Sequence, residues 1–342
     1  MRVMRIAVLA AAAAMAACGG GSGPASRSAD TGPLTIGLLL DTLDTERWQR
    51  DRDLFVARVE ELHAKVEVRS GDGTHAGQLQ AARELLDAGV KTLVVVANDL
   101  EQGKEIVELA AERKVPVISY DRLIRDADVA LYVSFDSVKV GRMQAEALLT
   151  AAPKGNYVLL GGAPTDNNAK LVRDGQLEVL EPAIASGAVK VVADPWVDNW
   201  DATLARDATN AALKKTPSIA AVLASNDSTA TGAAEALSAH KLSGKVALSG
   251  QDADLAACQR IVAGTQTMTV YKPLRSLARM AAGSAVSLAK GEAVDSLVKV
   301  HNGHKDVPAR LLEPIAVDKS NIDVTVISDG YHQKEAVYQT GA

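Results

Sequence analysis

The sequence predicts an α/β protein built from two doubly wound parallel sheets in tandem. Short β-branched apolar runs alternate with longer amphipathic stretches, and this series starts again near the middle of the chain. The length of 342 residues is about twice that of a typical domain. Continuous apolar strands separated by helices are typical of a parallel sheet that helices cover on both faces.

The first half of the chain predicts one such sheet. Its apolar runs are TIGLLL at 35, KVEVRS at 65, TLVVVA at 92, VPVISY at 115 and ALYVSF at 130. Between them, RDLFVARVEELHA places Phe55, Val59 and Leu62 on one helical face, and AGQLQAARELLDAG ends in a glycine suited to a helix cap. The other charges of the first helix, from Arg50 to Asp53, are expected on its exposed first turns.

The second half repeats the series. Its runs are NYVLLGG at 156, VKVVAD at 189, IAAVLASN at 219, KVALSG at 245 and TMTVY at 267, with helical stretches such as NAKLVRDGQLEVLEPAIASG between them. Two strand ends read alike, because Asn98 and Asp99 follow one run and Asn226 and Asp227 follow another. A further helix, LRSLARMAAGSAVSLAKG, and a polar tail with a strand-like run, DVTVIS, are not placed by pattern alone.

Composition excludes several classes of partner. Hydrophobic residues make up 47% and charged residues 23%, which is ordinary for a soluble globular protein. The net charge is -5 and no basic block stands out, so nothing indicates nucleic acid or an anionic membrane surface as a partner.

The N-terminus predicts export. Residues 1–18 are expected to be a lipoprotein-type signal peptide, in which two arginines precede an apolar stretch from Ile6 to Ala17 and a small-residue cleavage context ends at Cys18. The apolar stretch is shorter than the roughly 20 residues that span a bilayer. Residues 15–18 resemble a bacterial lipobox, in which the cysteine is lipidated, although Met15 replaces the usual leucine. An ordinary signal peptide with an incidental cysteine is the alternative. The Gly/Ser-rich residues 19–33 are expected to be a flexible linker, and Cys258, with no other cysteine to pair with, is expected to be buried.

Polar side chains recur directly after the predicted strands. Ligands of open parallel sheets bind at the carboxyl ends of the strands, so two facing lobes would bring both sets of strand ends to one cleft. Carboxylates, amides, arginine and lysine satisfy both faces of sugar hydroxyls, and tryptophan offers a flat face to a pyranose ring. The residues at these strand ends are Asp44, Arg47, Trp48, Asp121, Arg122, Asn167, Asn168, Arg173, Trp196, Trp200, Asn226, Asp227, Asp252, Asp254 and Lys272.

Other interpretations of the same residues stay open. Trp48 lies seven residues before Phe55 and could be the first core residue of that helix. Asn167, Asn168 and Asn226 could be helix caps. No catalytic, phosphate-binding or zinc motif occurs, and Gly303 makes a metal site at His301 and His304 unfavourable, so no cofactor and no metal are predicted.

The mature chain resembles the periplasmic sugar-binding proteins of bacterial ABC transporters, and most of all their D-xylose-binding members. The resemblance covers about residues 35 to 333 and rests on these segments: ERWQRDRDLFV, SYDRLIRDAD, YVSFD, GNYVLLGGAPTDNNAKL, WVDNW, ASNDSTA, SGQDADLA, AGTQTMTVYKP and DVPARLLEPI. It implies the periplasmic binding protein type I fold, with two lobes joined by three crossovers. The lobes expected from it are residues 34–137 with about 273–308, and residues 138–272 with about 309–342.

The resemblance also implies a set of sugar-contacting residues. It places polar contacts at Arg47, Asp121, Arg122, Asn168, Arg173, Asn226, Asp252 and Lys272, and stacking aromatic rings at Trp48 and Trp196.

The expected function is therefore capture of D-xylose between the lobes and delivery to a membrane permease, by a lipid-anchored monomer in the periplasm or on the outer face of the cytoplasmic membrane. Another aldose, or a receptor role in chemotaxis or sensor-kinase signalling, is the alternative. A sugar-responsive transcription regulator is disfavoured because an export signal occupies the place of its DNA-binding helices. A glycoside hydrolase is disfavoured because arginines near Asp121 and Asp252 would keep both carboxylates ionised, leaving no general acid.

Overall fold

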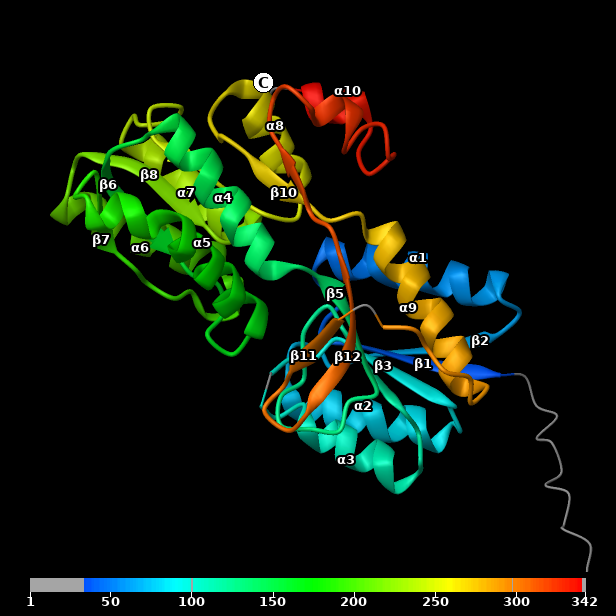
Figure 1. Cartoon of the computed structure of the whole chain (residues 1–342). Coiled ribbons are helices and arrows are strands. Elements are labelled where there is room, and N and C mark those ends of the chain that lie inside the picture. Colours follow the sequence, from blue (N-terminus) through cyan, green and yellow to red (C-terminus); the bar gives the residue numbers. More distant parts are fainter. Residues whose placement is uncertain (1–33, 100, 297, 340–342) are drawn as a thin grey trace, which may run out of the picture. The chain divides into compact units, whose positions relative to one another are not determined.

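The computed structural model describes residues 34–99, 101–296 and 298–339 (Figure 1). The predicted signal and linker segments, including Cys18, lie outside the described residues. Within the described part of the chain, no helix combines the length and the apolar character needed to cross a membrane.

The first sheet confirms the predicted parallel arrangement. Its order, within the described residues, is β11-β12-β5-β4-β3-β1-β2, and its pairs are parallel except for the antiparallel hairpin of β11 and β12 at one edge. The strands are β1 (Thr35–Leu40), β2 (Lys65–Ser70), β3 (Thr92–Val95), β4 (Val117–Tyr120), β5 (Leu131–Phe135), β11 (Val298–His301) and β12 (Asp306–Leu312).

Helices cover both faces of this sheet, as a doubly wound fold requires (Figure 1). The helices are α1 (Glu46–Glu61), α2 (His75–Asp87), α3 (Lys104–Glu112) and α9 (Leu274–Ala289). Phe55 of α1 and Leu277 of α9 share one apolar cluster with the strands. Leu85 of α2 and Ile106 of α3 belong to the cluster on the other face. The first sheet is therefore completed by α9, which comes from far along the chain.

The second lobe contains a parallel sheet of order β7-β6-β8-β9 and a two-stranded antiparallel pair of β10 and β13. Helices α4 and α5 pack on one face of this sheet, and α6 and α7 on the other. The strands are β6 (Gly155–Leu160), β7 (Val189–Ala193), β8 (Ile219–Ala224), β9 (Ala247–Leu248), β10 (Thr269–Tyr271) and β13 (Ile315–Val317). The helices are α4 (Ser137–Ala151), α5 (Asn167–Ala185), α6 (Ala202–Lys215), α7 (Asp227–Ala239), α8 (Leu255–Ala263) and α10 (Lys334–Tyr338).

Along the described residues the chain passes between the two sets of strands after β5, after β10 and after β12. These crossings lead from β5 into α4, from β10 into α9, and from β12 into β13. Because β12 pairs with β5 as far as Leu312, the last crossing follows that residue. The lobe boundaries expected from the sequence stay a prediction.

The strand-like run DVTVIS does not form a strand. Ile322–Val324 is a 3-10 helix, and the backbone N–H of Ile327 donates to the carbonyl of Ile322 at 3.2 Å. Ile322 and Val326, four residues apart, are both buried in a cluster with Cys258. The apolar spacing therefore reflects a helical turn, and no strand is assigned within this run. Cys258 is buried, as expected.

In the second lobe, the backbones of α4 and α5, and those of α6 and α7, approach each other closely at glycine residues. A Cβ atom added to Gly141 of α4 would overlap the carbonyl oxygen of Val172 on α5, and one added to Gly175 of α5 would overlap that of Val138. Gly232 of α7 lies equally close to the carbonyl of Ala202 on α6. These positions leave no room for any side chain.

Candidate functional site

Strand ends from both lobes line one cavity of about 580 Å³. It takes residues from the segments that follow β1, β2, β3, β4, β6, β7, β8, β9 and β10. Eight of the ten residues predicted as sugar contacts lie in its lining, namely Arg47, Trp48, Asp121, Arg122, Asn168, Asn226, Asp252 and Lys272. Parallel sheets bring strand carboxyl ends together, which explains why residues so far apart in sequence meet here.

Arg47 joins carboxylates of both lobes. Its Nη2 lies 2.8 Å from Asp121 Oδ1, and its Nη1 lies 3.3 Å from Asp252 Oδ1. Lys272 Nζ lies 2.8 Å from the same oxygen of Asp252. Burial acts to raise the pKa of Asp121, but Arg47, Lys272 and Arg122 outweigh it and lower that pKa to about 2. Asp121 is therefore an acceptor at every physiological pH and cannot serve as a general acid.

Arg122 is held by carboxylates on both sides of the cavity. Its Nη1 lies 2.7 Å from Asp41 Oδ2, and its Nε lies 3.2 Å from Asp166 Oδ2. Burial acts to lower the pKa of Arg122, but Asp166 and Asp41 act against it and raise the pKa above its usual value. The guanidinium is thus fixed in place as a cation.

Trp48 is both a core residue and a cavity residue. It is only 4% exposed and belongs to the apolar cluster of α1 and α9, yet it also lines the cavity. The guanidinium carbons of Arg47 and Arg122 lie 4.6 and 5.3 Å from its ring centroid. The core interpretation is therefore confirmed, and its place in the lining leaves the sugar-contact interpretation as a prediction.

The two predicted amide contacts lie at helix N-termini. Asn226 caps α7 by accepting from the backbone N–H of Thr229 at 2.9 Å, so the helix-cap interpretation holds as well. Because its oxygen is engaged in the cap, its amide nitrogen is the part that can donate to a ligand. Asn168 lies in the first turn of α5 and donates to the backbone carbonyl of Asp121 at 2.9 Å, which ties the two lobes together.

The structure does not bring Arg173 and Trp196 to the cavity lining. Arg173 is buried, donates to Gln176 at 3.1 Å and pairs with Asp194. Its guanidinium carbon lies 5.2 Å from the ring centroid of Trp196, which is 41% exposed. These two residues pack on each other beside the cavity.

Trp200 lines the cavity instead of Trp196. Asn199 and Trp200 have φ values of 53° and 58°, a left-handed conformation that is uncommon for residues other than glycine. The ring of Trp200 packs against Gly162, where a Cβ atom would overlap it, and Ser228 donates to the backbone carbonyl of Trp200 at 2.8 Å. Of the two tryptophans, the one with the left-handed backbone lines the cavity.

Several polar residues of the lining were not selected from the sequence. Asp41 directly follows β1 and Asp166 directly precedes α5, so both carry the strand-end signal that identified the others. Asn98 belongs to the pair of similar strand ends and donates to Asp41 at 2.6 Å. Gln251 precedes the selected Asp252.

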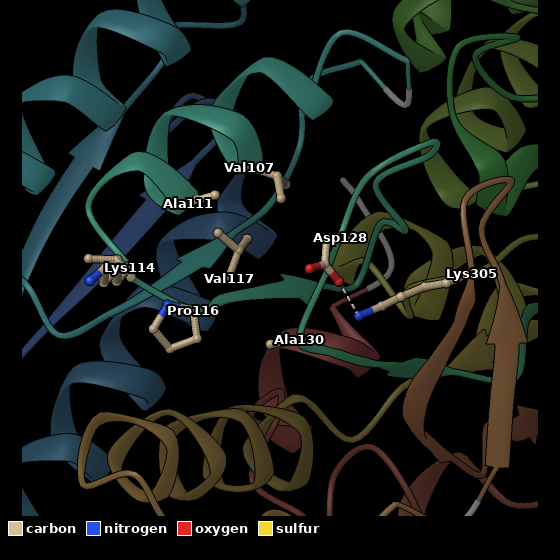
Figure 2. A pocket seen from close by; sticks show the side chains of 9 residues that line it. Val107, Ala111, Lys114, Pro116, Val117, Asp128, Ala130 and Lys305 are labelled. Carbon is tan, nitrogen blue, oxygen red and sulfur yellow. Dashed lines mark hydrogen bonds and ion pairs between the residues drawn. The ribbon is translucent and has the colours of Figure 1, made fainter.

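A second hollow, of about 350 Å³, lies at the opposite ends of β4 and β5 (Figure 2). Its lining is mostly aliphatic, and Lys305 pairs with Asp128 at one side of it (Figure 2). It contains none of the predicted site residues. Among the residues that the structure describes, no group of three or more His, Cys, Asp or Glu side chains is placed to hold a metal ion.

Two doubly wound lobes whose strand ends share one polar cavity with tryptophan rings define a two-lobed solute-binding protein. The chain belongs to the periplasmic binding protein family, because residues 36–293 match the family model described as "Periplasmic binding protein domain". The family and fold predicted from the sequence are thereby confirmed.

Named relatives support the same family. The chain is 51% identical over 314 residues to the "D-xylose-binding periplasmic protein" of Haemophilus influenzae, covering 92% of this chain and 95% of the relative. It is 50% identical over 300 residues to the protein of the same name from Escherichia coli, covering 87% and 91%. A solved carbohydrate transporter solute binding protein from Chloroflexus aurantiacus, in complex with D-glucose, is 32% identical with a TM-score of 0.83, covering 90% of this chain and 98% of the other.

Proposed function

We propose that this protein is the sugar-binding component of an ABC importer and that its ligand is D-xylose. The observation that carries the proposal is that two relatives named for D-xylose binding share about half of their residues with this chain over nearly their whole length. The cavity supports it, since it combines cations, ionised carboxylates, amides and two tryptophan rings.

The proposed contacts divide between apolar and polar faces of the sugar. Trp48 and Trp200 offer flat faces to the C–H surface of a pyranose ring. Each sugar hydroxyl both donates and accepts, so it can bond to a carboxylate and a cationic side chain at once. The polar set is Arg47, Asp121, Arg122, Asn168, Asn226, Asp252 and Lys272.

Specificity follows from the desolvation of these groups. A sugar that lacks one hydroxyl leaves a buried partner without a hydrogen bond, which costs about 1 to 3 kcal/mol. An added hydroxymethyl group is excluded by shape. The lobes close around the sugar because the closed state alone makes contacts from both sides, and the closed form presents a composite surface to the permease.

Calorimetric titration with D-xylose, D-ribose, D-glucose and D-galactose tests the proposal. We expect D-xylose to bind most tightly. A hexose of the glucose type is the second candidate, because the similar solute-binding protein from Chloroflexus aurantiacus holds D-glucose. If only D-glucose binds, the ligand is a hexose and not D-xylose, while the protein is still a sugar-binding protein. If no sugar binds, the proposed function is wrong.

Replacing each tryptophan separately tests the placement of the stacking ring. Trp200→Ala is expected to weaken D-xylose binding by roughly tenfold, because a stacking contact and its buried area contribute about 1.5 kcal/mol. Trp196→Ala is the matched control and should leave the Kd within about twofold, because that ring lies outside the lining. The reverse order of effects in titration calorimetry would show that Trp196 is the stacking residue.

We further propose that the protein is exported and lipid-anchored through Cys18. The relatives named as periplasmic proteins support export. The lipobox-like residues 15–18 support the anchor. The mass of the mature N-terminus distinguishes a diacylated cysteine from an ordinary cleaved signal peptide.

A further inference from the structure

Asp51 occupies an unexpected position behind the sugar cavity. The sequence places it among the exposed charges of the first helix, but its side chain is only 1% exposed and does not line the cavity. It follows Arg47 by one helical turn, and its Oδ2 lies 3.4 Å from Arg47 Nε. Its Oδ1 accepts a hydrogen bond from the hydroxyl of Tyr120.

We infer that Asp51, held by Tyr120, is a positioning residue that fixes Arg47 for sugar binding. The inference rests on the proposed function, because it assigns Arg47 to the sugar. Asp51 itself does not touch the ligand. It acts through the guanidinium in front of it.

The geometry of Arg47 supports this role. Its two terminal nitrogens face Asp121 and Asp252 in the cavity, and its Nε faces Asp51 from behind. The guanidinium is therefore in contact with a carboxylate at each of its three nitrogens. Without the rear contact, it could rotate about its long side chain and lose the orientation that a sugar hydroxyl needs.

Tyr120 ties this arrangement to the core. It is buried at the end of β4, directly before Asp121, and its ring packs edge-on against Phe55 at a centroid distance of 6.5 Å. The Tyr120 to Asp51 hydrogen bond therefore joins α1, which carries Arg47, to the strand end that carries Asp121. The two elements cannot shift independently while it is intact.

Because Asp51 titrates, its ionisation should make the affinity for the sugar depend on pH. Burial raises the pKa of Asp51 to about 6, against the lowering effects of Arg47 and of the Tyr120 hydrogen bond, with smaller contributions from Asp121 (raising) and Lys272 (lowering). Burial also raises the pKa of Tyr120 well above its usual value, so the hydroxyl remains a donor. Asp51 is thus ionised above about pH 6 and neutral below it, and the hold on Arg47 weakens as the pH falls.

Two cavity groups with raised pKa values, Asp166 and Asp254, have to be separated from Asp51. Burial, and then Asp252, raises the pKa of Asp254 to about 7, and Asp254 lines the cavity. The variant Asp254→Asn removes this group. It therefore shows how much of any pH dependence belongs to Asp254, and Asp166→Asn does the same for Asp166.

The test is the Kd for D-xylose at about pH 7.5 and about pH 5.5. The wild-type protein is expected to bind several-fold more weakly at the lower pH. Asp51→Asn is expected to bind roughly tenfold more weakly at the higher pH, because an amide that accepts from Tyr120 points its NH₂ group at the N–H of Arg47. It should also lose most of the pH dependence.

Tyr120→Phe gives a second, independent readout. Loss of its hydrogen bond removes an interaction that lowers the pKa of Asp51, so the midpoint of the affinity change should move to higher pH. Asp53→Asn is the matched control on the same helix, since Asp53 pairs with Arg52 and is 68% exposed, and it should behave as the wild type.

The outcomes separate the two proposals. If the wild type binds D-xylose and Asp51→Asn keeps its Kd and its pH profile, the positioning role is wrong while the proposed function stands. The role is also wrong if the pH dependence survives in Asp51→Asn and disappears in Asp254→Asn, or if Tyr120→Phe leaves the midpoint unchanged. If the wild type binds no sugar, the proposed function fails and this inference fails with it.

Discussion

Arg122→Ala is expected to remove most of the sugar affinity. The guanidinium lies between Asp41 and Asp166, which come from different lobes, and it also donates to the carbonyl of Ala97 at 3.0 Å. Truncation leaves two buried carboxylates without their cation and removes a donor from the cavity. Losing one partner of a buried, hydrogen-bonded charge pair costs about 2 to 5 kcal/mol, so the Kd should rise by at least about thirtyfold. Titration calorimetry measures the change.

The matched control for this variant is Arg113→Ala. Arg113 forms an exposed ion pair with Asp87 at 2.6 Å, far from the cavity lining, so its loss should leave the Kd unchanged. Arg122→Lys is expected to fall between the wild type and Arg122→Ala, because lysine keeps the charge without the planar fork that reaches two carboxylates. Binding by Arg122→Ala within about threefold of the wild type would show that the cavity is not the sugar site.

Gly141→Ala is expected to lower the stability of the protein although it adds only one methyl group. A Cβ atom at this position would overlap the carbonyl oxygen of Val172, so α4 and α5 would have to separate. Helix propensity favours alanine by about 1 kcal/mol, but overpacking against backbone costs about 1 to 3 kcal/mol and cannot be relieved by rotating a side chain. The free energy of unfolding should therefore fall despite the better helix former.

Gly283→Ala provides the opposite result in the same experiment. Gly283 lies inside α9 and has open space where its Cβ atom would be, so only the propensity effect applies. The midpoint of thermal unfolding should rise slightly in this variant and fall in Gly141→Ala. A rise in both would mean that the α4 and α5 backbones are not held in contact.

The location of the cavity could be predicted from the sequence because it depends on topology alone. Alternating strands and helices indicate a parallel sheet, and polar residues that follow its strands must meet at one edge. Arg47, Asp121 and Asn226 were found in this way. The same rule points to Asp41, which follows β1 directly, but it does not rank one strand-end carboxylate above another.

Features that depend on a single backbone angle could not be predicted. The run ADPWVDNW contains two tryptophans, and the second one, in the left-handed conformation that Asn199 and Trp200 share, lines the cavity. The prediction that Asp51 is exposed was wrong for a related reason. Its charge indicates an exposed position, and only the Tyr120 hydroxyl and Arg47, from a strand end and the preceding turn, make its burial acceptable.

The three crossings between lobes set the order in which the chain can fold. The first sheet needs α9 to cover one face and β12 to pair with β5, and the second lobe needs β13 to pair with β10. Neither lobe is complete until the chain has been made as far as about Val317. A chain that has been synthesised only as far as β10 therefore contains no finished lobe, and both lobes acquire their last strands almost together.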